Sequence, residues 1–263
     1  MEKVLLAAIK ALENGQPCAL ATVVESAKGT PQKIGAKMVV FRDGTCFGTV
    51  GGGLNEEKTR KECLKAIKNQ KHSLVPLSYS KKDGFLCGGQ IKVFVEPIAA
   101  QKSLIICGAG HIGLPLSIIG KTLDFKVTVL DNRKAFANKK RFPHVDKIIC
   151  DTFDKGLSKV SANQNTFVVI VTAGHAYDFQ CLKKIIHSKA AYIGIICSQS
   201  KKQEFIKKLH KSGIANDLIK RIKMPIGLDI GALSPQEIAV SIAAEIVSIY
   251  NHDLVGSAKF SCK

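Results

Sequence analysis

A glycine-rich loop constrains the fold more than any other feature of this 263-residue sequence: Cys107-Gly108-Ala109-Gly110-His111-Ile112-Gly113. It follows an apolar run typical of a buried strand and precedes a helical pattern. The three glycines allow a tight turn, close approach of a pyrophosphate to backbone N–H groups, and close packing of helix on strand. Asp131 ends the next predicted strand, about 20 residues later, where a carboxylate can bind ribose hydroxyls. The combination predicts a Rossmann-like dinucleotide-binding fold.

The chain from Ser103 onward alternates short apolar strands with helical patterns of crossover length. This alternation is typical of a parallel sheet covered by helices on both faces, and we expect the strand order 3-2-1-4-5. A last helix begins at Ser234-Pro235-Gln236-Glu237, which has the residues of a capping box, and carries an isoleucine stripe. The predicted strands are Leu104–Cys107, Lys126–Leu130, Lys147–Cys150, Thr166–Val171 and Ala190–Ile195.

The first part of the chain has a different pattern, in which strands with period-two alternation are mixed with two helices. An Asp-Gly turn between Ala36–Phe41 and Thr45–Val50 predicts a hairpin. The segment Pro97–Ser103 is interpreted as a linker. We therefore expect an α/β protein with two domains: a smaller α+β domain over residues 1–98, and a doubly wound Rossmann-like domain over 99–263. The other predicted elements are a helix with Val4, Leu5, Ala8, Ile9 and Leu12 on its apolar side, a strand at Pro17–Ser26, a helix at Asn55–Gln70 and a strand at Gln90–Glu96.

Composition narrows the classes of protein that fit. The formal net charge is +18, yet only five of the 39 basic residues are arginines, and nucleic-acid readers favour arginine. The scattered lysines favour a solvated surface over a specific nucleic-acid site. Nine cysteines without framework spacing, no apolar run long enough for a membrane span and no signal-peptide pattern at the N-terminus predict a cytoplasmic protein that is not in a membrane.

The predicted strand order places the loop after the fourth strand beside the glycine loop. His175 and Asp178 have a spacing that suits a base with its orienting carboxylate, or two metal ligands, while Asp178 also suits a helix cap. Arg133 could accommodate a 2′-phosphate, whereas Asp131 argues for free ribose hydroxyls. His111 either faces the ligand crevice or lies in solvent. Cys197 and Ser198 follow the fifth strand on the same rim.

Two further clusters lie in the first domain. Gly51, Gly52 and Gly53 precede a helix that carries Glu56 in its first turn, which predicts an anion-binding nest. Cys87 stands beside Gly88 and Gly89 on a predicted loop, where a thiol can be exposed and reactive. The alternative for Cys87 is a small residue before a glycine bulge.

A series of segments in both halves of the chain matches one family in residues and in order. They are Gly48–Glu56, Cys87–Gly89, Val93–Pro97, Gly108–Gly113, Asp131–Arg133, Arg141–Pro143, Gly174–Asp178, Tyr192–Gly194 and Pro225–Glu245. In these segments the sequence resembles the XdhC/CoxI family, the xanthine dehydrogenase accessory proteins. It departs from the family pattern at Cys197-Ser198-Gln199, where Gly-Ser-Arg is usual, and at Gln32 and Lys33, where an arginine is common.

The resemblance implies a maturation factor that binds molybdenum cofactor in its molybdopterin form and assists its sulfuration and insertion. The implied partners are an apo molybdenum hydroxylase of the xanthine dehydrogenase type and a cysteine desulfurase, and a homodimer is expected. The protein would then be a chaperone rather than an enzyme, with Cys87 near the metal. The alternatives are an NAD(P)-dependent oxidoreductase and an NAD-sensing regulatory protein. The cofactor-binding candidates are Gly51, Gly52, Gly53, Glu56, Cys87, Gly88, Gly89, Gly108, Gly110, His111, Gly113, Asp131, Arg133, His175 and Asp178.

Overall fold

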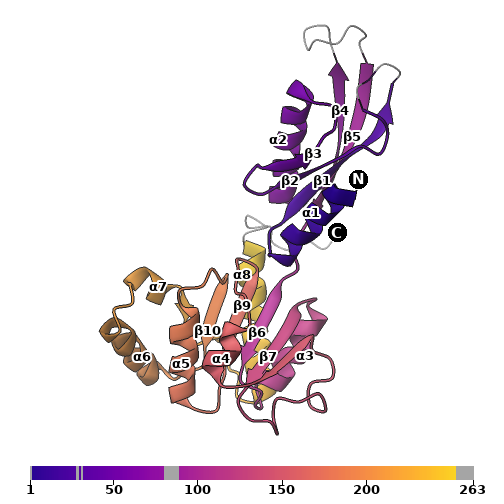
Figure 1. The fold of residues 1–263 in the computed structure, drawn as a ribbon. Helices are drawn as coiled ribbons and strands as arrows, with labels where there is room; N and C mark the ends of the chain where they lie inside the picture. The colour runs from indigo at the N-terminus through magenta and orange to yellow at the C-terminus, as the bar shows by residue number, and fades with distance from the viewer. Residues whose placement is uncertain (1, 28–29, 31, 80–88, 253–263) are drawn as a thin grey trace. The chain divides into compact units, whose positions relative to one another are not determined.

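The computed structural model describes residues 2–27, 30, 32–79 and 89–252 (Figure 1). The chain separates into two compact units, Met1–Ala100 and Gln101–Lys263, each with its own sheet. Within the described residues, no helix is long and apolar enough to cross a membrane. We describe each unit by itself.

The first unit is an antiparallel sheet with the strand order β3-β2-β1-β5-β4. Alternate residues of β1 face opposite sides, so Ala19, Ala21 and Val23 pack with helix α2, while Cys18 and Leu20 pack with helix α1. The elements are α1 (Glu2–Glu13), β1 (Cys18–Ser26), β2 (Lys37–Phe41), β3 (Cys46–Gly48), α2 (Gly53–Asn69), β4 (Ser73–Tyr79) and β5 (Gly89–Ile98).

The predicted hairpin is confirmed by the antiparallel pairing of β2 with β3. Strand β4 was not predicted, because Pro76 and a mixed polar pattern hide its alternation; it pairs with β5 at the edge of the sheet. The linker prediction was wrong at its start, since β5 pairs with β1 as far as Ile98. In α1 the buried residues are Val4, Ala8 and Ala11, whereas Leu5 and Ile9 are exposed, so the predicted apolar side is rotated.

The second unit is a parallel six-stranded sheet with the order β11-β10-β9-β6-β7-β8. The five predicted strands occur in the predicted order, and β11 extends the sheet. Helices α3 and α8 cover one face, and α4 to α7 cover the other, each over its own apolar core (Figure 1). The elements are β6 (Ser103–Cys107), α3 (Gly113–Thr122), β7 (Lys126–Asp131), β8 (Lys147–Cys150), α4 (Phe153–Ser158), β9 (Thr166–Ile170), α5 (His175–Ile185), β10 (Tyr192–Ile195), α6 (Gln199–Lys211), α7 (Asn216–Lys220), β11 (Ile222–Lys223) and α8 (Pro235–His252).

The last helix, α8, begins with the predicted capping box. The backbone N–H of Glu237 donates to Ser234 Oγ, and Glu237 Oε2 accepts from the backbone N–H of Ser234 at 2.9 Å. Ile242 and Ile246 are buried against the sheet. Further along, Glu245 Oε2 accepts from the Tyr192 hydroxyl and the Gly227 N–H. Glu245 thus connects α8 both to the start of β10 and to the segment that precedes α8.

Candidate functional site

The glycine loop lies between β6 and α3. Its three glycines differ in what a side chain at each position would contact. Gly108 has φ 122°, and a side chain there would overlap the carbonyl oxygen of Val171. A side chain at Gly113 would overlap the carbonyl oxygen of Gly108. Gly110, in contrast, has no heavy atom of the described residues within 4 Å of the position that a Cβ would take. The middle glycine therefore leaves open space beside the loop, which is where a ligand could approach the backbone.

Asp131 at the end of β7 is buried, with 1% of its surface exposed. Its Oδ1 accepts from the backbone N–H and the Nε of Arg133, both at 2.9 Å, and its Oδ2 accepts from Arg133 Nη2 and the backbone N–H of Ala109, both at 2.8 Å. Burial alone would raise the pKa of Asp131, but these hydrogen bonds outweigh burial and hold its pKa below the ordinary value. Both carboxylate oxygens are thus already engaged within the protein.

Arg133 links this carboxylate to an aromatic and basic cluster. Its guanidinium lies 4.0 Å from the ring centroid of Phe136, and the guanidinium of Arg141 lies 4.7 Å from the same centroid. Within the described residues Arg141 forms no ion pair, whereas Arg133 pairs with Asp131. Two of the five arginines of the chain therefore stack on one ring, and one of them, Arg133, shares Asp131 with the backbone N–H of Ala109 in the glycine loop.

A small cavity of about 120 Å³ lies at this edge of the sheet. Its walls come from the end of β7, the start of α4, the loop after β9 and the first turn of α5. Tyr177 and Phe153 form its aromatic side, with ring centroids 5.4 Å apart. Its lining residues are Asp131, Asn132, Arg133, Phe153, Ala173 and Tyr177.

Asp178 fastens the loop after β9. It is 1% exposed, and its Oδ1 accepts from the Thr172 hydroxyl at 2.6 Å and the Thr172 N–H at 3.2 Å. His175 is the first residue of α5, and its side chain is outside the described structure. The base-and-orienter interpretation of this pair stays a prediction, while the contacts of Asp178 give it a role in shaping the loop.

The remaining rim residues lie on neighbouring loops of the same edge. His111 is exposed in the turn before α3. Cys197 is half-buried against the core, which raises the pKa of its thiol, and Ser198 caps α6 by accepting from the Lys201 N–H. Burial of this kind is typical of a packing cysteine rather than a reactive one.

The predicted nest in the first unit holds an anion that the chain itself supplies. Glu56 Oε1 accepts from the Gly52 N–H at 3.1 Å and from the Thr49 hydroxyl, and the Thr49 hydroxyl accepts from the Gly51 N–H at 3.2 Å. Gly53 begins α2 with φ 61°. The structure thus brings Gly51, Gly52, Gly53 and Glu56 together, with the carboxylate of Glu56 in the position that a ligand anion would take.

The predicted metal-site residue Cys87, together with Gly88, lies outside the described residues. Gly89 begins β5, where it pairs with Tyr79. Across the described ranges, no group of three or more His, Cys, Asp or Glu side chains could hold a metal ion. The metal interpretation of Cys87 therefore stays a prediction.

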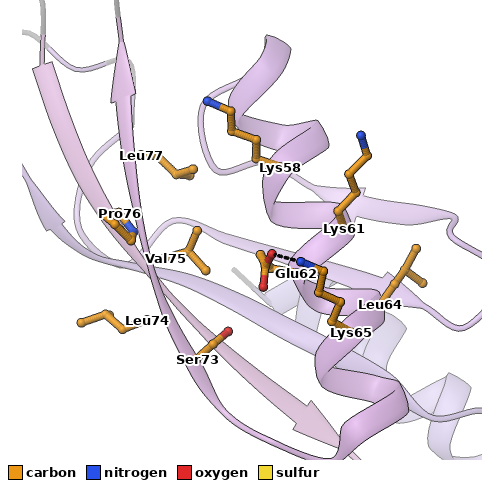
Figure 2. A pocket seen from close by; sticks show the side chains of 10 residues that line it. All are labelled: Lys58, Lys61, Glu62, Leu64, Lys65, Ser73, Leu74, Val75, Pro76 and Leu77. Carbon is orange, nitrogen blue, oxygen red and sulfur yellow. Dashed lines mark hydrogen bonds and ion pairs between the residues drawn. The ribbon is translucent and has the colours of Figure 1, made fainter.

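A second hollow, of about 560 Å³, lies between α2 and β4 and was not predicted from the sequence (Figure 2). Lys58, Lys61 and Lys65 project from α2 on one side, and Lys65 pairs with Glu62 at 2.7 Å. Ser73 on β4 carries the single buried side-chain oxygen without a hydrogen-bond partner among the described residues. Its lining residues are Lys58, Lys61, Glu62, Leu64, Lys65, Ser73, Leu74, Val75, Pro76 and Leu77.

Sequence reasoning identified the glycine loop, Asp131 and Arg133, but it did not identify the aromatic side of the cavity or the role of Thr172. Tyr177 stands within the segment Gly174–Asp178, and Arg141 within the segment Arg141–Pro143, that carried the resemblance. Those two segments were the signal that could have pointed to these residues. The contact of Tyr177 with Phe153 and the stacking of Arg133 and Arg141 on one ring depend on tertiary structure, which the sequence does not specify residue by residue.

Comparisons with known proteins find matches in both units. Residues 104–246 match the XdhC Rossmann domain, and residues 11–79 match the XdhC and CoxI family. The chain is 32% identical over 250 residues to the uncharacterized protein YqeB of Escherichia coli (strain K12), covering 93% of this chain and 46% of that protein. It is 28% identical over 155 residues to a probable xanthine dehydrogenase subunit of Bacillus subtilis (strain 168), covering 59% of this chain and 45% of that protein.

A third relative is similar over most of its length. The molybdenum cofactor insertion chaperone PaoD of Escherichia coli (strain K12) is 23% identical, covering 95% of this chain and 88% of PaoD. The chain spans less than half the length of YqeB and of the Bacillus subtilis relative. A solved structure, a xanthine dehydrogenase (BH1974) from Bacillus halodurans, shares the fold with a TM-score of 0.54 at 22% identity, covering 95% of this chain and 97% of that one. The family matches span both units, and the chain belongs to the XdhC and CoxI family.

Proposed function

We propose that this protein is a maturation factor that holds molybdenum cofactor and assists its insertion into a molybdenum hydroxylase of the xanthine dehydrogenase type. The observation that carries the proposal is the similarity to a molybdenum cofactor insertion chaperone over 88% of that chaperone's length, together with membership of the family. In this role the cofactor is cargo, so the protein needs a site that binds and releases it rather than a site that transforms it.

We assign the anionic end of such a cargo to the second unit, at the glycine loop and the 120 Å³ cavity lined by Asp131 and Arg133. Gly110 leaves room for close approach to the backbone, and Arg133, which shares Asp131 with the loop residue Ala109, stacks with Arg141 on the ring of Phe136. Tyr177, which is 43% exposed, offers an aromatic face at the cavity. Phosphate groups bind well where arginine forks and backbone N–H groups converge. Gly108, Gly110, His111, Gly113, Asp131, Arg133, His175 and Asp178 thus remain our candidates in this unit.

The first unit carries the remaining candidates, and we assign the metal end of the cargo to Cys87. A soft thiolate suits molybdenum–sulfur chemistry. We further propose that the cargo is sulfurated by a cysteine desulfurase while it is held, and that the protein works as a homodimer with an apo hydroxylase as its client. These finer statements rest on the family resemblance.

The direct test is to purify the protein from a host that makes molybdenum cofactor, and to measure bound molybdenum by mass spectrometry and bound pterin by fluorescence. We expect both on the wild type, together with activation of an apo hydroxylase. Cys87→Ala should lose most of the molybdenum. Cys46→Ala is the matched control, because Cys46 is an exposed thiol of the same unit on β3.

Two results would contradict the proposal in different ways. Wild-type protein without molybdenum or pterin at micromolar concentration would refute the chaperone function. Equal retention by Cys87→Ala and Cys46→Ala would keep the chaperone function and remove Cys87 from its site.

An NAD(P)-dependent oxidoreductase, or an NAD sensor, is the second candidate, favoured by the glycine loop. Both need a bound nicotinamide nucleotide, so NADH fluorescence should change on mixing with the protein. The engagement of both Asp131 oxygens by Arg133 and Ala109 counts against the NAD-binding forms of this candidate, because that carboxylate would otherwise bind the ribose hydroxyls.

A further inference from the structure

Asp131 stands where a Rossmann fold usually places the carboxylate that binds ribose hydroxyls, but its oxygens are already engaged within the protein. Asp131 accepts four hydrogen bonds, two on each oxygen, and is buried. A carboxylate has about four acceptor sites in all. A ribose hydroxyl could donate to Asp131 only after breaking its bidentate pair with Arg133, which would leave a buried charge without its partner.

The same arrangement leaves part of the Arg133 guanidinium available at the 120 Å³ cavity. Arg133 uses Nε and one N–H of Nη2 on Asp131, so both N–H groups of Nη1 and the second of Nη2 remain for another acceptor. Its side chain is 35% exposed and lines the cavity. Arg133 neutralises the charge of Asp131. Arg141 stacks on the same Phe136 ring and has no ion-pair partner among the described residues, so one positive charge beside Arg133 remains unneutralised.

The size of the cavity limits what part of a ligand it takes. Pockets for whole small ligands measure about 300–1,000 Å³. The 120 Å³ found here suits an end group such as a phosphate rather than a whole dinucleotide.

We propose that the 120 Å³ cavity binds a terminal phosphomonoester through Arg133, which lines it, together with the positive charge of Arg141 on the same Phe136 ring, and that Asp131 is the positioning residue of Arg133 rather than a ribose ligand. The site then rejects a nucleotide that offers only a free ribose diol. A phosphomonoester occurs at the 2′ position of NADP⁺ and at the end of phosphorylated pterins, and the proposed function favours the pterin source. The proposal itself concerns the phosphate and does not require molybdenum.

Two matched probe pairs test the proposal by isothermal titration calorimetry on the full chain. NADP⁺ differs from NAD⁺ by the 2′-phosphomonoester, and dihydroneopterin monophosphate differs from dihydroneopterin in the same way. Charge-assisted hydrogen bonds to one phosphate predict that the phosphorylated member of a pair binds on the order of tenfold to a hundredfold more tightly. A gain in only one pair identifies the source of the phosphate.

Arg141→Met should abolish most of this gain. Lys140→Met is its matched control, because it removes the same charge from the exposed neighbouring position without touching the Phe136 ring. Replacing Arg133 is less informative, since it leaves Asp131 unpaired and endangers the fold. If Arg141→Met does not fold, the two probe pairs on the wild type still decide the question.

Equal affinity within both pairs, no binding by any probe, or an unchanged gain in Arg141→Met would each overturn the inference. None of these results touches the measurement of bound molybdenum and pterin. A protein that retains the cofactor but does not distinguish the probes would lose this inference and keep the proposed function, and the reverse result would do the opposite.

Discussion

The three glycines of the glycine loop differ in whether the packing of the fold requires them. A side chain at Gly108 or Gly113 would overlap a backbone carbonyl oxygen, whereas a side chain at Gly110 would meet no atom of the described residues. Gly113 is needed for the close approach of α3 to the loop, and Gly110 is not needed by the packing of the described residues.

We therefore expect opposite results from two alanine substitutions. Gly113→Ala should lower the free energy of unfolding by about 1–3 kcal/mol, because the loop must move to admit the methyl group. Gly110→Ala should leave that free energy unchanged or raise it by up to about 1 kcal/mol, since alanine reduces the entropy of the unfolded chain. Urea unfolding measures both. Retention of cofactor should fall in Gly110→Ala although its stability does not, and unimpaired retention would contradict a ligand role for this loop.

At the scale of elements, α8 holds the segment that precedes it. Glu237 accepts from the backbone N–H groups of Leu233 and Ser234 at 2.8 and 2.9 Å, and further along the Ser241 hydroxyl donates to the Leu228 carbonyl. The N–H groups of Ser234 and Leu233 lower the pKa of Glu237. The cap is therefore a charge-dependent feature of the helix.

The cap gives a pH prediction with a definite sign. A carboxylate with a lowered pKa in the folded state stabilises the fold above its unfolded value, near 4.5, and loses this contribution as pH falls through the folded pKa. Glu237→Gln should thus be less stable than the wild type at pH 7, and the difference should shrink at pH 3. Asp229→Asn, an exposed acid before α8, is the control and should show a smaller difference at pH 7. A Glu237→Gln difference independent of pH would refute the charged cap.

Local signals in the sequence were enough to predict most elements, and tertiary contacts explain the failures. The glycine loop, the β2–β3 hairpin and the capping box each depend on a few adjacent residues, and all three were predicted, whereas β4 was missed. The rotated face of α1 and the extension of β5 to Ile98 depend on which neighbour packs against them. The engagement of Asp131 by Arg133 depends on the direction that one side chain takes, which spacing does not specify.

At the scale of the whole molecule, the two units have separate cores. Residues of β1 and β5 form the core of the first unit with α2, and the cores of the second unit draw only on residues after Gln101. Only residues 99–102 separate the last strand of one sheet from the first strand of the other. A compact unit with its own core can fold alone.

We expect residues 101–263, expressed without the first unit, to unfold cooperatively and to give a dispersed NMR spectrum. The full chain serves as the reference for the amide chemical shifts of β6 to β10. A fragment that is soluble but shows no cooperative transition would contradict the independence of the second core. Binding of the phosphorylated probes by this fragment would further locate their site in the second unit.

Gly110 also bears on how sequences in this family change over evolutionary time. Glycine costs conformational entropy that another residue would spare, and at this position no contact among the described residues requires it. A lineage that stopped carrying a ligand would be released from selection at 110 while Gly108 and Gly113 stayed fixed by the fold. On the function that we propose, the residue at this one position would mark whether a distant relative still carries cargo, and it can be read from the gene alone.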